Sequence, residues 1–197
     1  MLKCTLTLIL FFLSLIPATH SVACVGRTLY IGALESNNDS LMAEMIALLI
    51  TERTGTTIQI RAFKTSDELY TALKSEKELE RVDIIVEDTI QALAIAKQSA
   101  GASPDQDFIT VKDYYEKALN VVWLNPFGYT KKIAQPSISA PLLRRDILTN
   151  FPLLPRVLNK LAGAINDKEF QELTKSVNAG DKPKNIAKEF LKKQKFI

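Results

Sequence analysis

Residues 28–63 read TLYIGALESNNDSLMAEMIALLITERTGTTIQIRAF, and this stretch decides the fold. It opens with a short apolar run at 28–34 that is rich in β-forming residues, which predicts a buried strand. The apolar run at 41–50 is interrupted only by Glu44, so we expect a helix that is buried on most of its sides. Residues 57–63 alternate between apolar and polar side chains, which predicts a second strand.

Capping residues mark where the predicted helices begin and end. Asn38 or Asp39 can cap the first helix at its N-terminus, and Gly55 is suited to its C-terminus. Thr65 and Glu68 stand three residues apart, which is the spacing of a capping box. A second helix should therefore begin directly after the second strand.

The alternation of strand and helix continues along the chain. Residues 82–86 predict a third strand, and Asp88 can cap the helix that follows it. A helix at 111–119, capped by Thr110, and a fourth strand at 121–124 come next. Such alternation favours an α/β fold, with a mostly parallel sheet of four to five strands and helices on both faces.

The last third of the chain has a different pattern. We expect a loop at residues 99–107 and irregular structure at 129–139. Four helical segments should follow, at residues 141–149, 153–161, 168–177 and 183–193. No internal repeat and no second domain is visible, so residues 24–197 are expected to form one unit with a helical C-terminal segment.

The N-terminus has the pattern of a signal peptide. A short basic start with Lys3 is followed by an apolar run at 4–16 and a small-residue segment that ends at Ala23. We therefore expect residues 1–23 to be removed and the protein to lie in the periplasm or cell envelope. Two interpretations remain open: ordinary cleavage after Ala23, or a lipoprotein in which Cys24 carries the lipid.

Composition then excludes several classes of protein. Cys4 and His20 leave with the signal peptide, so the mature chain would keep only Cys24 and no histidine. Intramolecular disulfides, histidine-based catalysis and thiolate or imidazole metal sites are thereby excluded, and we expect a protein without cofactor that is not an enzyme. Without residues 1–23 the chain holds 24 basic and 22 acidic residues, which does not suit nucleic-acid binding.

Three stretches resemble the substrate-binding proteins of quaternary-amine ABC transporters, the OpuAC-type domain. Residues 31–54, IGALESNNDSLMAEMIALLITERT, resemble that family's first strand, polar ligand loop and long buried helix. Residues 82–93, VDIIVEDTIQAL, are similar to a stretch that in many members carries a tyrosine after the glutamate. Residues 139–197 look like its C-terminal helices, with SAPLLRRDIL, FPLLPRVLNKLAGAIND and KPKNIAKEFLKK in order.

The resemblance implies a type II periplasmic-binding-protein fold, but two features depart from the family. Its members normally have two lobes, and here only residues 127–138 lie where the second lobe would be inserted. A segment of this length cannot bury a core, so we expect a single lobe. Asp88 stands where many relatives have an aromatic residue, which removes one cation–π contact with a quaternary ammonium.

Ligand contacts are expected where the strands end, because open α/β sheets bind ligands at the carboxyl ends of their strands. The candidates are Glu35, Ser36, Asn37, Asn38, Glu87, Asp88, Thr89, Phe127 and Tyr129. For the loop at 35–39 and for Asp88, helix capping is an alternative that needs no ligand. Trp123 alternates with apolar neighbours on the fourth strand, so we expect it in the core.

These inferences lead to two functional hypotheses. In the first, the protein is the secreted solute-binding component of an ABC transporter for quaternary amines such as glycine betaine, choline or carnitine. Its partners would be the solute and either an ABC permease or a second protomer, which would complete the half-site. It would be attached to the membrane only through that permease or through a lipid on Cys24. In the second, the lobe is an envelope interaction or sensing module that has lost solute transport.

Overall fold

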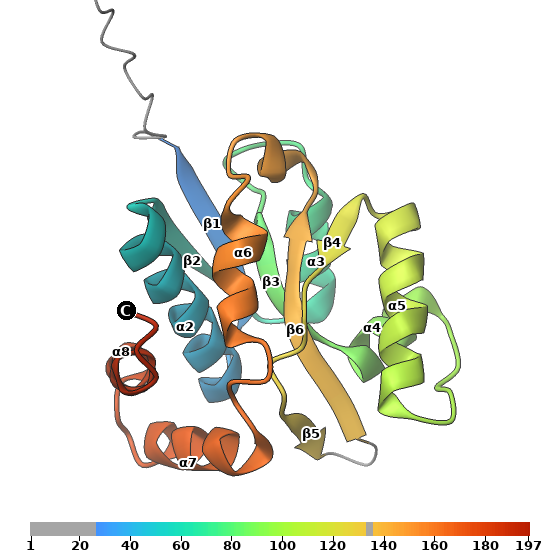
Figure 1. Cartoon of the computed structure of the whole chain (residues 1–197). Coiled ribbons are helices and arrows are strands. Elements are labelled where there is room, and N and C mark those ends of the chain that lie inside the picture. The colour runs from blue at the N-terminus through green and yellow to red at the C-terminus, as the bar shows by residue number, and fades with distance from the viewer. Residues whose placement is uncertain (1–26, 133–135) are drawn as a thin grey trace, which may run out of the picture.

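A mixed β-sheet forms the centre of the protein (Figure 1). The computed structural model describes residues 27–132 and 136–197. The strands are β1 (Thr28–Leu34), β2 (Thr57–Phe63), β3 (Ile84–Asp88), β4 (Val121–Trp123), β5 (Thr130–Lys132) and β6 (Pro136–Arg144). The helices are α2 (Asn37–Thr54), α3 (Ser66–Lys74), α4 (Thr89–Ala96), α5 (Pro104–Ala118), α6 (Leu154–Leu158), α7 (Asp167–Asn178) and α8 (Pro183–Lys193), with short 3₁₀ turns at Asp146–Thr149 and Asn159–Leu161.

The strand order β2-β1-β3-β6-β4 confirms the predicted α/β class. Strand β1 pairs in parallel with β2 and β3, whereas β6 pairs in antiparallel fashion with β3, β4 and β5. Strands β1 to β4 therefore share one direction, and β6 runs against them. The carboxyl ends of β1 and β3 consequently meet at the same edge of the sheet.

Strand β6 corrects two predictions. The irregular segment expected at 129–139 contains β5 and the start of β6, and the helix expected at 141–149 is the rest of β6 followed by a 3₁₀ turn. Residues 137–144 are almost all buried, so the strand lacks the alternation that marks a half-exposed strand. Pro141 is tolerated inside it because its carbonyl accepts the Leu124 N–H beyond the end of β4, and the missing N–H would point the same way.

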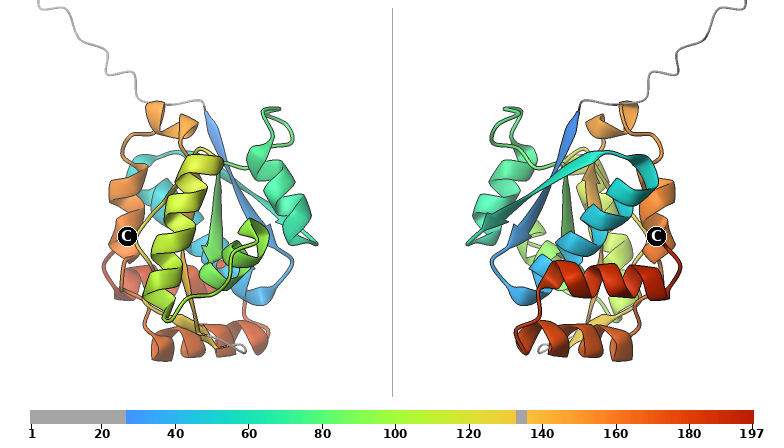
Figure 2. Two further views of the ribbon diagram at one scale, coloured as in Figure 1. Left: turned by 90° about the vertical axis from the view of Figure 1, so that its right-hand side faces the viewer. Right: turned by 90° about the vertical axis from the view of Figure 1, so that its left-hand side faces the viewer.

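Helices cover both faces of the sheet. Helices α2, α6 and α8 lie over one face, and α3, α4 and α5 lie over the other (Figures 1 and 2). Helix α7 crosses the lower end of the first group, next to β5 in Figure 1. Each layer encloses its own apolar core, and Trp123 is buried in the second of them, as predicted.

The helix ends agree with the sequence in some places and differ in others. Gly55 ends α2 in a left-handed conformation, and the capping box of Thr65 and Glu68 starts α3, both as predicted. Asn38 and Asp39 do not cap α2, because Ser36 takes that position and accepts a hydrogen bond from the Asp39 N–H. The helix thus begins two or three residues earlier than expected.

Helix α5 begins within the segment predicted as a loop. Ser103 caps it by accepting a hydrogen bond from Gln106, and Pro104 occupies its first turn. The predicted cap, Thr110, lies inside the helix and donates to the Gln106 carbonyl instead. The Ser-Pro pair was the signal for this start, since proline suits the first helical position.

The predicted signal peptide, residues 1–23, and the candidate lipidation site Cys24 lie outside the described residues. Among the residues that are described, no helix is long and apolar enough to cross a bilayer. At the C-terminus α7 and α8 confirm the predicted helices, and Pro183 stands in the first turn of α8. The helix predicted at 153–161 is the short α6 continued by a 3₁₀ turn.

Gly128 links β4 to the loop that carries Tyr129, and its environment leaves no room for a side chain. Its φ is +106°, and a Cβ there would stand 2.8 Å from the Gly163 Cα. We expect Gly128→Ala to lower the free energy of unfolding by about 2–3 kcal/mol, because left-handed strain and a backbone clash add together. Chemical denaturation measures this loss, and Gly180→Ala, which has a positive φ but open space, should lose less.

Candidate functional site

A cavity of about 170 Å³ lies at the carboxyl ends of β1 and β3. The strands β1 and β3 and the N-terminal parts of α2, α3 and α4 supply most of its wall. Helix α7, strand β6 and the loop between β4 and β5 supply the rest. The lining residues are Gly32, Ala33, Leu34, Asn38, Asp39, Met42, Ala43, Ser66, Leu69, Val86, Glu87, Asp88, Gln91, Tyr129, Ser139 and Phe170.

The first turn of α2 brings two polar side chains to the cavity. The Asp39 carboxylate accepts a hydrogen bond from the Ser36 hydroxyl, which fixes it at the start of the helix. Asn38 Oδ1 is shielded from solvent and accepts no hydrogen bond within the described structure. Beside them Asn37 donates to Asn178 Oδ1 at 2.9 Å, so this turn is tied to the end of α7.

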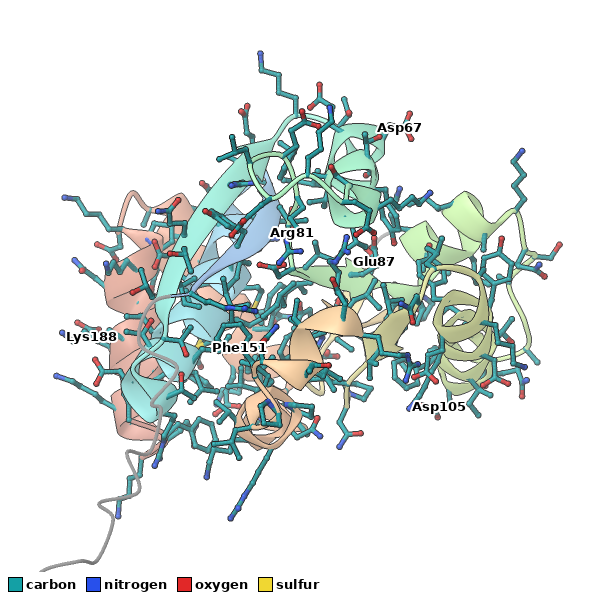
Figure 3. The ribbon with its side chains drawn as sticks, turned by 90° about the horizontal axis from the view of Figure 1, so that it is seen from above. Asp67, Arg81, Glu87, Asp105, Phe151 and Lys188 are labelled. Atoms are coloured by element: carbon teal, nitrogen blue, oxygen red, sulfur yellow. The ribbon has the colours of Figure 1, made fainter. Side chains whose placement is uncertain are left out.

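Glu87 is held by a buried network at the end of β3. Its carboxylate accepts hydrogen bonds from the Tyr70 hydroxyl and from the Asp88 N–H, both at 2.7 Å. The Tyr115 hydroxyl lies 3.1 Å from that of Tyr70 and donates to the Ala92 carbonyl at 3.0 Å. Burial raises the pKa of Tyr70 and of Tyr115 well above the ordinary range, so both phenols stay protonated. Figure 3 labels Glu87 in a view along the sheet, from the end opposite the cavity.

Asp88 is the predicted cap of α4, and the structure confirms that role. Its Oδ1 accepts the Gln91 N–H at 2.9 Å and the Ser137 hydroxyl at 2.7 Å. Thr89 is buried and accepts the Ile138 N–H through its hydroxyl, so it fastens β6 to the helix. Both residues thus position the cavity wall, and Asp88 also lines the cavity.

Three aromatic rings form a parallel stack at the α7 side of the cavity. The Tyr129 ring lies 3.8 Å from that of Phe170 and 6.0 Å from that of Phe127, both nearly parallel to it. Tyr129 and Phe170 line the cavity, whereas Phe127 is fully buried behind them. Burial raises the pKa of the Tyr129 phenol, and the carboxylates of Asp39 and Asp88 raise it further, against a hydrogen bond with Ser139.

The charged groups in the wall are of one sign. Asp39, Glu87 and Asp88 line the cavity, and none of its described lining residues is lysine, arginine or histidine. Asp39 lies in the first turn of α2 and Asp88 is the N-cap of α4, where each helix carries partial positive charge. No group of three or more potential ligands in the described part of the chain is arranged to hold a metal ion.

The structure brings together only part of the predicted site. Asn38, Glu87, Asp88 and Tyr129 line the cavity. The others lie around it: Glu35, Ser36 and Asn37 are exposed, and Thr89 and Phe127 are buried behind the wall.

Several lining residues were not foreseen. Met42 lies on the buried helix α2, Ser139 on β6 and Phe170 on α7. Phe170 is the most consequential, because it supplies an aromatic face to the cavity wall beside Tyr129. Its helix shows only an ordinary amphipathic pattern, which gives no sign of a binding role.

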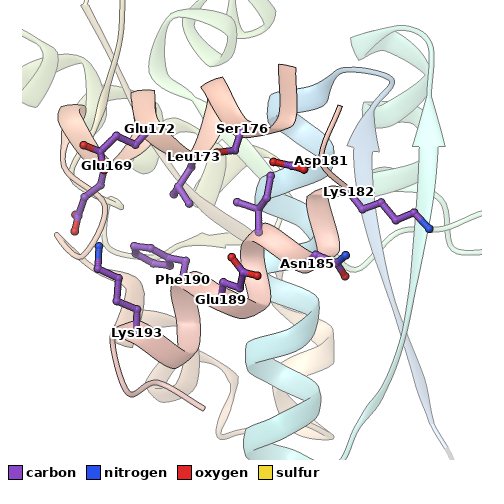
Figure 4. Close-up of a pocket in the computed structure, with 11 residues that line it drawn as sticks. Glu169, Glu172, Leu173, Ser176, Asp181, Lys182, Asn185, Glu189, Phe190 and Lys193 are labelled. Atoms are coloured by element: carbon purple, nitrogen blue, oxygen red, sulfur yellow. The ribbon is translucent and has the colours of Figure 1, made fainter. Parts of the chain in front are cut away.

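A second hollow, of about 480 Å³, lies between α7 and α8 (Figure 4). Its rim is formed by charged side chains of both signs that are largely exposed, among them Glu172, Asp181, Glu189 and Lys193. Phe190 lies at its base and belongs to the core beneath. This hollow is the solvated junction of two amphipathic helices, and it does not touch the strand ends.

No family model matches the sequence. A crystal structure of a glycine betaine/carnitine/choline ABC transporter superposes with a TM-score of 0.77 at 16% sequence identity, over 86% of this chain and 98% of that chain. Apo YehZ from Escherichia coli superposes with a TM-score of 0.72 at 13% identity, over 86% of this chain and 99% of that chain.

The fold matches one lobe of a periplasmic binding protein. This confirms the fold class expected from the sequence, including the sheet with helices on both faces. At such low identities the similarity establishes the fold, and the choice of ligand has to be argued from the cavity itself.

Proposed function

We propose that this protein is a non-enzymatic solute-binding protein whose ligand is a small quaternary ammonium compound. The observation that carries the proposal is the composition of the cavity at the strand ends. Three carboxylates and the rings of Tyr129 and Phe170 line it, and its described wall holds no basic residue. Phe170 stands at the end of the aromatic stack, so its outer face is the one that can meet a cation. Carboxylates balance a positive charge, and aromatic faces attract it by about 0.5–2 kcal/mol each.

The cavity also selects by size and by net charge. Its volume of about 170 Å³ corresponds to about five or six water molecules, which suits a compact ammonium group. A zwitterion such as glycine betaine or carnitine would bring its own carboxylate close to Asp39, Glu87 and Asp88. We therefore propose choline as the preferred ligand among the three.

We also propose where the protein is located and what it binds. The solute-binding role would place it in the periplasm, after removal of residues 1–23, with an ABC permease as its partner. The single lobe would provide half of a cleft, which a second protein covers. The intact mass of the protein recovered from the cell envelope distinguishes cleavage after Ala23 from lipidation at Cys24.

Isothermal titration with choline, glycine betaine and carnitine tests the proposed function. We expect choline to bind most tightly, and Asp39→Asn to weaken its binding about tenfold because one of the balancing charges is lost. Asp67→Asn is the matched control, since Asp67 lies at the start of α3 but outside this cavity. Absence of binding by all three compounds, or equal affinity in Asp39→Asn, would contradict the proposal.

A further inference from the structure

The outer edge of β2 is uncovered in the described part of the protein. Strand β2 stands first in the sheet order and pairs only with β1. It is seven residues long, contains no proline and carries one charged side chain, Arg61. The opposite edge strand, β4, has three residues and packs against α5. Long edges without a blocking feature pair readily with another strand.

One hydrogen bond shows which backbone groups of β2 point outward. The Phe63 carbonyl accepts the Glu35 N–H at 2.9 Å, so the polar groups of Phe63 face β1. The backbone N–H and C=O groups of successive residues in a strand point to alternate sides. The N–H and C=O groups of Ile58, Ile60 and Ala62 therefore point outward, away from β1. These three residues provide the free row of donors and acceptors at the edge.

The side chains beside this edge are apolar. Ile58 and Ile60 line a groove of about 460 Å³ between β2 and the helices α2 and α8, together with Leu48. Ile60 is 37% exposed, although it lies in the middle of a strand. Glu44 and Lys184 also line the groove, so each copy presents one acid and one base there.

We propose that two copies of this chain pair through β2, antiparallel about a two-fold axis at Ile60, and form one continuous sheet. In this register Ile60 lies opposite its own copy and Ile58 lies opposite Ala62, so every outward group is paired in roughly six hydrogen bonds. The groove residues of the two copies then lie on the same face of the joined sheet, on either side of the axis.

The register itself argues for a second copy over an unrelated strand. On the other face of the sheet the same pairing sets Gln59 opposite Arg61, whose guanidinium is already held 3.6 Å above the Tyr30 ring. Between residues 58 and 62, polar residues thus meet polar ones and apolar residues meet apolar ones, and only the end pair, Thr57 opposite Phe63, is mixed. The cavity at the ends of β1 and β3 stays open in this dimer, so the inference is independent of the proposed function.

Sedimentation equilibrium and disulfide crosslinking test the dimer. We expect the protein to be in a concentration-dependent monomer–dimer equilibrium, and Ile60→Pro to weaken association at least about tenfold, since proline removes the outward N–H at the axis. The substitution should leave the far-UV circular dichroism spectrum unchanged, because the Ile60 N–H points outward and has no acceptor within the described monomer. A wild-type protein that is monomeric at every concentration overturns the proposal, as does a dimer unaffected by Ile60→Pro.

The crosslinking experiment fixes the register even if Ile60→Pro fails to fold. In a background of Cys4→Ser and Cys24→Ser, the Ile60→Cys variant should oxidise to a covalent dimer, because directly opposite residues in a hydrogen-bonded pair have Cα atoms about 5.5 Å apart. Leu79→Cys, at a position that is 88% exposed and outside β2, is the control that should stay monomeric. Equal crosslinking of the two variants would overturn the proposed axis.

Discussion

Replacing Arg144 with methionine should lower the free energy of unfolding by about 3–5 kcal/mol, the largest loss that we expect from one substitution. Arg144 is 7% exposed on β6. Its guanidinium donates to the Leu73 and Ser75 carbonyls at 2.9 and 2.8 Å and pairs in bidentate fashion with Asp146 at 3.0 Å. Methionine would fill the space but leave these acceptors without their donor, in a setting that water cannot fully reach.

Urea denaturation measures the effect of Arg144→Met, and Arg145→Met provides the control. Arg145 is the exposed neighbour, and its guanidinium donates to the Val121 carbonyl at 3.2 Å. Its replacement should lower the free energy of unfolding by at most about 1 kcal/mol. If the two variants lose the same stability, Arg144 does not fasten α3 to β6 as the structure indicates.

At acid pH the free energies of unfolding of the wild type and of Arg144→Met should become more similar. The Arg144 guanidinium lowers the pKa of Asp146 in the folded protein. The stability gained from this pair is therefore present above the unfolded pKa, about 4, and is lost as the pH falls through the lower folded value.

The second large effect is expected at Tyr129. Tyr129→Leu removes the ring that stacks 3.8 Å from Phe170 and leaves an aliphatic side chain at the cavity wall. On the proposed function, choline should then bind about tenfold more weakly, because Phe170 loses the ring that holds its face at the cavity. Tyr129→Phe keeps the ring and loses only the hydroxyl, so it should bind nearly as well as the wild type.

Titration of both variants, after circular dichroism has shown that they are folded, separates the ring from the hydroxyl. If Tyr129→Leu and Tyr129→Phe lower the affinity for choline equally, the hydrogen bond between the Tyr129 hydroxyl and Ser139 matters and the ring does not. If both variants bind choline as tightly as the wild type, Tyr129 does not contribute to the site.

The first half of the fold could be predicted because its signals are local. Gly55 stops α2, the Thr65–Glu68 capping box starts α3 and Asp88 caps α4, and each of these acts within a few residues. Strand β6 could not be predicted in this way. Its residues are buried by helices on both faces and by β3 and β4 at its sides, so only the tertiary structure separates it from a buried helix.

The site was predictable where it depends on strand ends and not where it depends on packing. Glu87 and Asp88 directly end β3, and Asn38 follows β1, so topology alone brings them together. Phe170 lies far along the chain and reaches the cavity only because α7 packs across the start of α2. Phe127 was expected at a cleft, but its loop turns it into the core behind Tyr129.

The central claim is that the cavity at the strand ends recognises positive charge. Titration of the wild-type protein with choline and with its neutral isostere, in which carbon replaces the ammonium nitrogen, tests it most directly, since the two compounds have almost the same shape. We expect choline to bind at least about tenfold more tightly, because Asp39, Glu87, Asp88 and the ring face of Phe170 attract only the cation. Equal affinities for the two compounds, or no binding of choline, would contradict the account.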